Sequence, residues 1–162
     1  MRQINSVVLA LVWAAVAGTA PVMAQSQEPR PLVISAVNKT ADSAALARPG
    51  DVLAYSLAFT NLTGHSVSQV RFVDPLPKGL VYRTGSAGAD KAARIEYSID
   101  GGKSYAAEPM IAAVVQGRRV IKPAPREAYT HIRWTLAEPL AAGAQVTAVF
   151  EAEVSQSASE AK

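Results

Sequence analysis

The chain has few residues of the types that perform catalysis, and their spacing does not assemble a reactive group. It contains two histidines, His65 and His131, and no cysteine. A Ser-His-Asp site needs a nucleophile, a base and an orienting carboxylate that converge, and no G-x-S-x-G segment is present to hold a serine at a sharp turn. His65 follows Gly64 in an expected turn, and His131 falls on the outward side of an alternating segment. We therefore expect two surface histidines, no catalytic residue and no enzymatic activity.

Three acidic residues, Asp74, Glu96 and Asp100, are the candidates for a metal site. A calcium ion takes about six to eight oxygen ligands, and none of the three lies in a dense acidic loop of the D-x-D-x-D-G kind. Zinc sites built from cysteine are excluded, because the chain has none. We expect these carboxylates, and Asn61, to cap turns or to face solvent from strands. The sequence predicts no metal and no cofactor.

One stretch concentrates positive charge, and it is the first place to look for a binding surface. It contains Arg118, Arg119, Lys122 and Arg126. Such a cluster can attract an acidic partner or an envelope polyanion. The alternative is a solvated loop between strands. Both interpretations stay open from the sequence.

Trp134 is the one residue that suggests a sugar-stacking platform. It lies between Ile132 and Leu136, and residues two apart on a strand share a face. That parity favours a place in the core.

The first 24 residues have the pattern of a secretory signal peptide. Arg2 gives a positive start, Val7–Gly18 is apolar, and Val22-Met23-Ala24 resembles a cleavage site before Gln25. The rival interpretation, a membrane anchor, needs about 20 apolar residues, more than this run supplies. We expect a helical signal peptide, export by the Sec route, and a periplasmic or secreted protein without a membrane anchor after cleavage.

Charge and composition narrow the functional classes to which the exported part of the chain can belong. Arg2 is the only charged residue in the leader, so residues 25–162 carry a net charge one unit below the +3 of the whole chain. Nucleic-acid binders usually show a basic stripe with aromatic residues, and aromatic residues are only 6% here, so we expect no nucleic-acid partner. Without cysteine, this single domain must be held by its core alone.

Strict alternation of apolar and polar residues predicts half-buried strands in four segments. They are Asp51–Asn61, with Leu53, Tyr55, Leu57 and Phe59 inward; Arg94–Asp100, with Ile95, Tyr97 and Ile99 inward and Arg94, Glu96 and Ser98 outward; Thr130–Leu136, with Ile132, Trp134 and Leu136 inward; and Gln145–Val154, with Val146, Ala148, Phe150, Ala152 and Val154 inward.

Weaker signals complete the pattern. Leu32–Asn38, Val67–Val73 and Leu80–Arg83 are expected strands, with Val70 and Phe72 inward, and Asp100-Gly101-Gly102 is a hairpin turn. In residues 108–130 the segment Met110–Val115 suits a strand, which Gly117-Arg118-Arg119 would turn into Val120–Lys122. The fold class predicted is all-β, an immunoglobulin-like antiparallel sandwich of about seven to nine strands. The expected layout is a flexible lead-in at 25–31, the sandwich at 32–154 and a disordered tail at 155–162.

Four phrases resemble a known family. They are Pro49-Gly50-Asp51-Val52-Leu53-Ala54-Tyr55; Thr60-Asn61; Asp74-Pro75-Leu76-Pro77-Lys78-Gly79-Leu80-Val81-Tyr82; and Tyr97-Ser98-Ile99-Asp100-Gly101-Gly102. In this order they resemble the bacterial surface module called domain of unknown function eleven, an immunoglobulin-like repeat of envelope proteins. The resemblance implies a sandwich and an envelope location, and brings no catalytic residues. That family often occurs as tandem copies, whereas this chain shows one.

The leading hypothesis is a non-enzymatic structural or protein-interaction module of the bacterial envelope, with another envelope protein as its partner. The alternative is a carbohydrate- or polyanion-binding module that uses the basic stretch from Arg118 to Arg126. A third hypothesis is an assembly factor that lends or accepts an edge strand.

Overall fold

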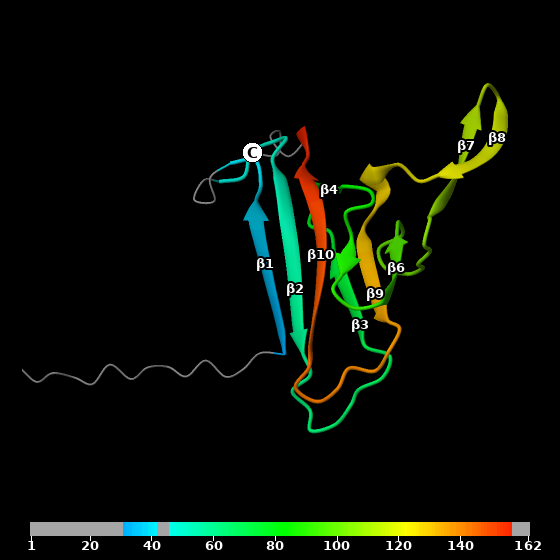
Figure 1. The fold of residues 1–162 in the computed structure, drawn as a ribbon. Coiled ribbons are helices and arrows are strands. Elements are labelled where there is room, and N and C mark those ends of the chain that lie inside the picture. The colour runs from blue at the N-terminus through cyan, green and yellow to red at the C-terminus, as the bar shows by residue number, and fades with distance from the viewer. Residues whose placement is uncertain (1–30, 42–45, 157–162) are drawn as a thin grey trace, which may run out of the picture.

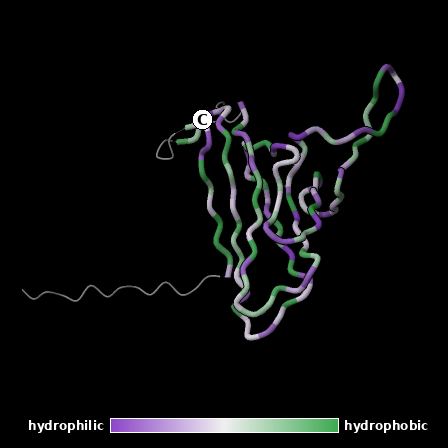
Figure 2. Tube along the Cα trace, viewed as in Figure 1, coloured by the Kyte–Doolittle hydropathy of each residue, from purple (hydrophilic) through white to green (hydrophobic). Residues whose placement is uncertain are grey.

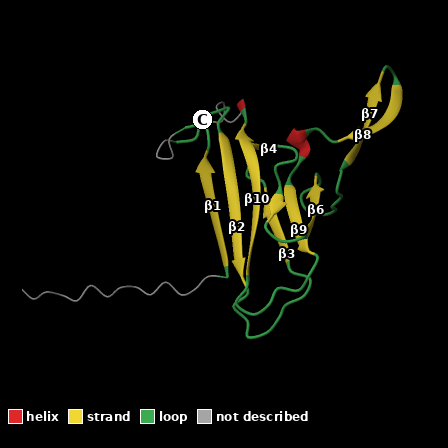
Figure 3. Ribbon diagram, viewed as in Figure 1, coloured by secondary structure: helices red, strands yellow, loops and turns green. Residues whose placement is uncertain are grey.

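The computed structural model describes residues 31–41 and 46–156, which are all β. These residues form ten strands, more than the seven to nine predicted, and the short 3-10 helix η1. Figures 1 and 3 show how the strands are arranged. The elements are β1 (Leu32–Asn38), β2 (Val52–Thr60), β3 (Arg71–Pro75), β4 (Leu80–Tyr82), β5 (Gly88–Ala89), β6 (Ala93–Ser98), β7 (Met110–Val115), β8 (Arg118–Pro123), η1 (Arg126–Ala128), β9 (His131–Leu136) and β10 (Gln145–Val154).

Two antiparallel sheets build the sandwich. The first has the order β1-β2-β10-β4, and β5 also pairs with β10. The second has the order β3-β9-β6. All pairings are antiparallel, so the predicted all-β antiparallel sandwich is confirmed.

The core lies where the inward faces of the two sheets meet. β2 and β10 run side by side with Leu57 opposite Ala148 and Tyr55 opposite Phe150, so the inward set predicted for each strand shares one face. The sheet opposite contributes Ile132 and Trp134, which are fully buried. Each large apolar side chain buried in this way stabilises the fold by about 1.5–3 kcal/mol. The predicted core position of Trp134 is confirmed, and a sugar-stacking role is excluded for it.

Turn residues set where β2 begins and ends. Gly50 has a φ of 91°, a conformation that glycine adopts without strain, and its N–H donates to the Val154 carbonyl at 2.8 Å. At the other end, the buried Asn61 amide nitrogen donates to the carbonyls of His65, Leu140 and Ala141 at 2.9, 2.9 and 3.0 Å. The turn-capping role predicted for Asn61 is confirmed, and it also joins two loops.

Two local predictions are wrong. The strand expected from Val67 begins only at Arg71, because Gln69 has a φ of 54° and interrupts the extended chain, although Val67 still bridges Leu140. Ser98, predicted to face solvent, is 1% exposed. Its hydroxyl donates to Asp100 at 2.7 Å and accepts from the Gly102 N–H at 2.9 Å. The turn after β6 therefore closes over this side chain.

The predicted signal peptide, all but one residue of the lead-in, and all but two residues of the tail lie outside the described residues. Within 31–41 and 46–156 there is no helix long and apolar enough to cross a membrane.

Candidate interaction surfaces

The hairpin formed by β7 and β8 projects from the sandwich (Figure 1). Neither strand pairs with a strand of either sheet. At its base the Ala124 N–H donates to the Pro109 carbonyl at 2.8 Å, which continues the pairing of the two strands, and both residues are buried. Gln116 and Gly117 have φ values of 50° and 77°, the left-handed pair that a tight two-residue hairpin turn requires. The strands are therefore built as a hairpin whose outer part has no partner in the described sandwich.

The hairpin separates the four basic residues predicted as one interaction surface. Arg118, Arg119 and Lys122 belong to β8, and the turn lies one residue earlier than the sequence suggests. Arg126 lies on η1, where it pairs with Glu127 at 2.9 Å and with Glu153 at 3.1 Å. The predicted solvated loop is a strand, and Arg126 is held against the sandwich instead of joining the other three.

Register divides the hairpin into two faces, since residues paired across an antiparallel ladder share a face. Val114 lies opposite Arg119, and Ala112 lies opposite Ile121. The other face carries Arg118 and Lys122, which lie opposite Val115 and Ile111. We call the first the apolar hairpin face; it comprises Met110, Ala112, Val114, Arg119, Ile121 and Pro123.

The apolar hairpin face is open to solvent. Val114 is 73% exposed, Ile121 66% and Met110 47%. Figure 2 shows the hydrophobic stretches that run along this projecting segment. Clusters of large exposed apolar side chains on a soluble domain mark interaction sites or aggregation liabilities. Arg119 is the only charged member of this face, and it has no ion-pair partner among the described residues.

A second apolar surface lies at the open side of the sandwich, beside β1. Leu32 and Ile34 sit opposite Phe59 and Leu57 and therefore point to the same side as the core. They are nevertheless 41% and 52% exposed. A hollow of about 480 Å³ lies there, which we call the edge groove; its lining includes Leu32, Ile34, Leu57, Phe59, Val70 and Phe72.

The two strands that border the edge groove are both edge strands, and β1 lacks the residues that usually protect an edge. Among the described strands, β1 pairs only with β2, and β3 pairs only with β9. Proteins usually guard such edges with charged residues or proline. From Leu32 to Asn38 there is neither. The groove thus presents unpaired backbone groups on a strand that is apolar on both faces.

Asp74 follows Phe72 on the same face of β3 but does not line the edge groove, and its predicted turn-capping role is wrong. It lies opposite the fully buried Ile132 and shares a face with Phe72, so its carboxyl points inward instead of capping a turn. No described residue donates a hydrogen bond to it. Burial raises the pKa of Asp74, although the charge of His131 opposes this. Burial, and next the Asp74 charge, raises the pKa of the nearby Tyr55 hydroxyl.

The other acidic candidates are engaged within the fold. Glu96 accepts from the Arg133 guanidinium at 2.8 Å and lies 3.4 Å from Arg94. The Asp100 carboxylate accepts from the Ser104 hydroxyl at 2.6 Å, and this bond leads several that lower its pKa. Among the described residues no three of these side chains, with or without histidine, gather as metal ligands would.

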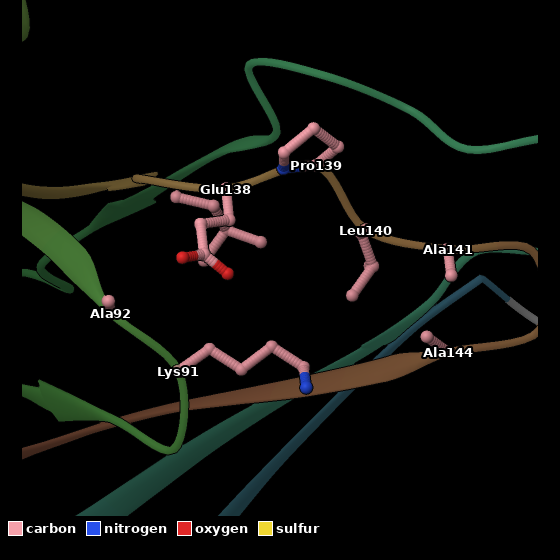
Figure 4. Close-up of a pocket in the computed structure, with 8 residues that line it drawn as sticks. Lys91, Ala92, Glu138, Pro139, Leu140, Ala141 and Ala144 are labelled. Carbon is pink, nitrogen blue, oxygen red and sulfur yellow. The ribbon is translucent and has the colours of Figure 1, made fainter.

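A smaller hollow of about 350 Å³ lies between the segment before β6 and the loop that joins β9 to β10 (Figure 4). Lys91 and Glu138 face it from different segments, and most of its remaining lining is apolar, including Pro139 and Leu140. None of the lining residues is a serine or histidine. The hollow offers one cation and one anion for binding.

No protein-family model, no curated protein and no solved structure matches this chain. The hairpin and the edge groove are therefore the features of the molecule that bear on its function.

The sequence indicated the hairpin but not the edge groove. The available signal for the groove was the uncharged, proline-free run from Leu32 to Asn38. That run shows that the strand lacks edge protection. It does not show that the facing sheet stops short of it.

Proposed function

We propose that the chain is a non-enzymatic protein-interaction module of the bacterial cell envelope, exported by its leader and related to the domain of unknown function eleven. The projecting hairpin is its contact element, and another envelope protein is its partner. One observation carries this proposal: Val114 and Ile121 are large, apolar and mostly exposed on a hairpin that pairs with neither sheet. Maintaining such a surface in water is unfavourable, and a partner that covers it would remove that cost.

The proposal predicts where the protein makes contacts in the cell. A photoreactive residue at position 114 or 121 should give a crosslinked product in intact cells. The matched control is position 46, because Leu46 is 91% exposed and belongs to neither surface. Equal yields from the hairpin and from position 46 would refute the hairpin as a contact element. Turnover of ester, peptide or glycoside substrates would refute the non-enzymatic part.

The location is tested separately. Cell fractionation should place the chain in the periplasm or the medium, and amino-terminal sequencing should begin at Gln25. A chain that keeps residues 1–24 and stays with the cytoplasmic fraction would contradict export.

Polyanion or carbohydrate binding is the second candidate, favoured by Arg118 and Lys122. They share the hairpin face opposite the apolar one and lack ion-pair partners among the described residues. Four residues apart on a strand, they stand about 13 Å from each other, whereas Arg119 points away and Arg126 is paired. Binding on a glycan array that is lost in the R118A/K122A double variant would favour this candidate over a protein partner.

A further inference from the structure

The two sheets of the sandwich face each other strand by strand, and β1 has no strand opposite it. Ring contacts place β3 opposite β2, β9 opposite β10 and β6 opposite β4. The pairs are Phe72–Phe59, Trp134–Phe150 and Tyr97–Tyr82, with ring centroids 5.6, 6.1 and 5.2 Å apart. β1 continues the first sheet beyond β2, whereas no described strand continues the second sheet beyond β3. The described sandwich is therefore one strand short in the second sheet, next to β3.

The edge groove lies at this position. Its lining includes Leu32 and Ile34 from β1 and Arg71, Phe72 and Val73 from β3. A strand added to the free edge of β1 would extend the first sheet and leave Leu32 and Ile34 uncovered. A strand added to the free edge of β3 would lie opposite β1 and cover both, as strands of facing sheets do. Only the second addition buries the exposed apolar side chains of the groove.

The backbone of β3 has groups available for such a strand. The Val70 carbonyl accepts from the Leu136 N–H at 2.9 Å, and the Leu76 N–H bonds at 2.8 Å to the residue before β9. Alternate residues of an antiparallel strand bond to the same neighbouring strand. The N–H and carbonyl groups of Arg71 and Val73 therefore point to the free edge, where an added strand can pair with them.

Arg71 indicates the charge of the occupant. Among the described residues that line the groove it is the only charged one. Its side chain is exposed and has no ion-pair partner within the described part of the chain. Arg71 alternates with the buried Phe72, so it lies on the outward side of β3. The residue opposite it on an added strand would share that side, and a pair of opposite charges there is favourable.

The exported chain does not supply this strand from the residues outside the described structure. These are residues 25–30, 42–45 and 157–162. None of the three stretches contains leucine, isoleucine, valine, methionine or an aromatic residue. They cannot cover the groove with large apolar side chains, so its occupant must come from another molecule.

We propose that the edge groove binds an extended segment of another protein, which pairs with the free edge of β3 as an additional strand. Its inward side chains are apolar and cover Leu32 and Ile34. The residue between two of them, opposite Arg71, is aspartate or glutamate. The segment thus carries an apolar-acidic-apolar pattern over three consecutive residues. This inference goes beyond the proposed function, because the groove is a different surface from the projecting hairpin.

The test selects peptides from a phage-displayed library of seven random residues on the full exported chain. The matched variant with a disabled groove is L32E/I34E, whose two positions are 41% and 52% exposed. The wild type should enrich peptides with the apolar-acidic-apolar pattern, and L32E/I34E should not. If the wild type enriches no peptide beyond L32E/I34E, or enriches peptides without the pattern, the inference is wrong.

Charge reversal tests the role of Arg71 without touching the core. R71E should change the enriched middle residue from acidic to lysine or arginine and keep the apolar residues on both sides of it. R71Q should weaken binding of the peptide selected on the wild type by about two- to fivefold. R118Q, on the hairpin, is the control and should leave binding unchanged. An unchanged pattern with R71E, or equal losses from R71Q and R118Q, would refute the pairing with Arg71.

Amide hydrogen exchange identifies the edge to which the selected peptide binds. The N–H groups of Arg71 and Val73 should exchange rapidly in the free chain and at least tenfold more slowly with peptide bound, whereas that of Phe72 should be slow in both states. Slowing at Ile34 and Ala36, which face the free edge of β1 by the same alternation, would place the peptide on β1 and overturn the inference. Slow exchange of Arg71 and Val73 without peptide would also overturn it, because the chain itself or a second copy would then cover this edge.

The hairpin supplies the comparison that separates this inference from the proposed function. V114S/I121S changes the hairpin alone and should bind the selected peptide as the wild type does; a loss of binding would refute the groove as the site. Peptide binding without crosslinking at position 114 would remove the hairpin proposal and keep this one. Crosslinking at position 114 without enrichment of any peptide would do the reverse.

Discussion

β1 and β10 flank the same strand, β2, and both direct apolar side chains inward, yet these side chains meet different surroundings. On β10, Val146, Ala148 and Phe150 are at most 1% exposed. On β1, Leu32 and Ile34 point to the same side of the sheet but are 41% and 52% exposed. The sheet opposite β10 contributes Trp134, which contacts Phe150 with ring centroids 6.1 Å apart. Facing inward and being buried are therefore separate properties, and the second depends on the other sheet.

The largest expected effect tests this difference directly. Phe150→Ala removes a ring that stacks on Tyr55 at 4.8 Å, and should lower the free energy of unfolding by about 3–5 kcal/mol. Ile34→Ala should lower it by less than about 1 kcal/mol, because half of the side chain already contacts water. Chemical denaturation measures both. Similar losses from the two variants would show that the groove is closed in solution.

Substitution of Asn61, which follows the end of β2, should cause the next largest loss of stability. Asn61→Ala removes the donor to three carbonyls in a buried place, and should destabilise the fold by about 2–3 kcal/mol. The control Leu62→Ala changes a half-exposed neighbour and should have little effect. A loss below about 0.5 kcal/mol for Asn61→Ala would mean that water replaces the amide.

The alternating pattern explains why β2, β9 and β10 could be predicted with their inward faces. Period two is a local property of a strand, so Trp134 could be assigned to the core from Ile132 and Leu136 alone. The bounds of β10 coincide with the predicted segment Gln145–Val154. The strand expected from Val67 failed because a single left-handed residue, Gln69, breaks it, and glutamine gives no warning of that conformation.

The candidate surfaces depend on contacts between distant segments, which periodicity does not contain. Arg126 lies four residues after Lys122, but Glu153, its partner, belongs to the last strand. Asp74 precedes a proline, as turn residues often do, yet its register with Ile132 turns it inward. The edge groove exists because β3 is the last strand of its sheet, which only the topology reveals.

Asp74 and Asp51 should respond to pH in opposite directions. Burial raises the pKa of Asp74 above its ordinary 3.8. The stability that the neutral carboxyl contributes is therefore fully present below pH 3.8 and is lost as the pH rises through the raised pKa. The Arg48 N–H, followed by the Asn38 amide, lowers the pKa of Asp51, so its contribution is lost as pH falls through the lowered value. Asp74→Asn should therefore stabilise the protein at neutral pH with the gain vanishing in acid, as measured by denaturation from pH 3 to 8. A gain that grows in acid would contradict the inward position of Asp74.

The smallest effect on folding is expected at the hairpin, and its smallness is what distinguishes this region from the core. Val114→Ser and Ile121→Ser change side chains that are 73% and 66% exposed, so each should alter the free energy of unfolding by no more than about 0.5 kcal/mol. Loss of the fully buried Val146 side chain from β10 would cost several times as much. If the serine variants were strongly destabilised under dilute conditions, the hairpin would belong to the folding core. If they unfold like the wild type but associate less, the apolar side chains are retained for contact between molecules, because the fold does not need them.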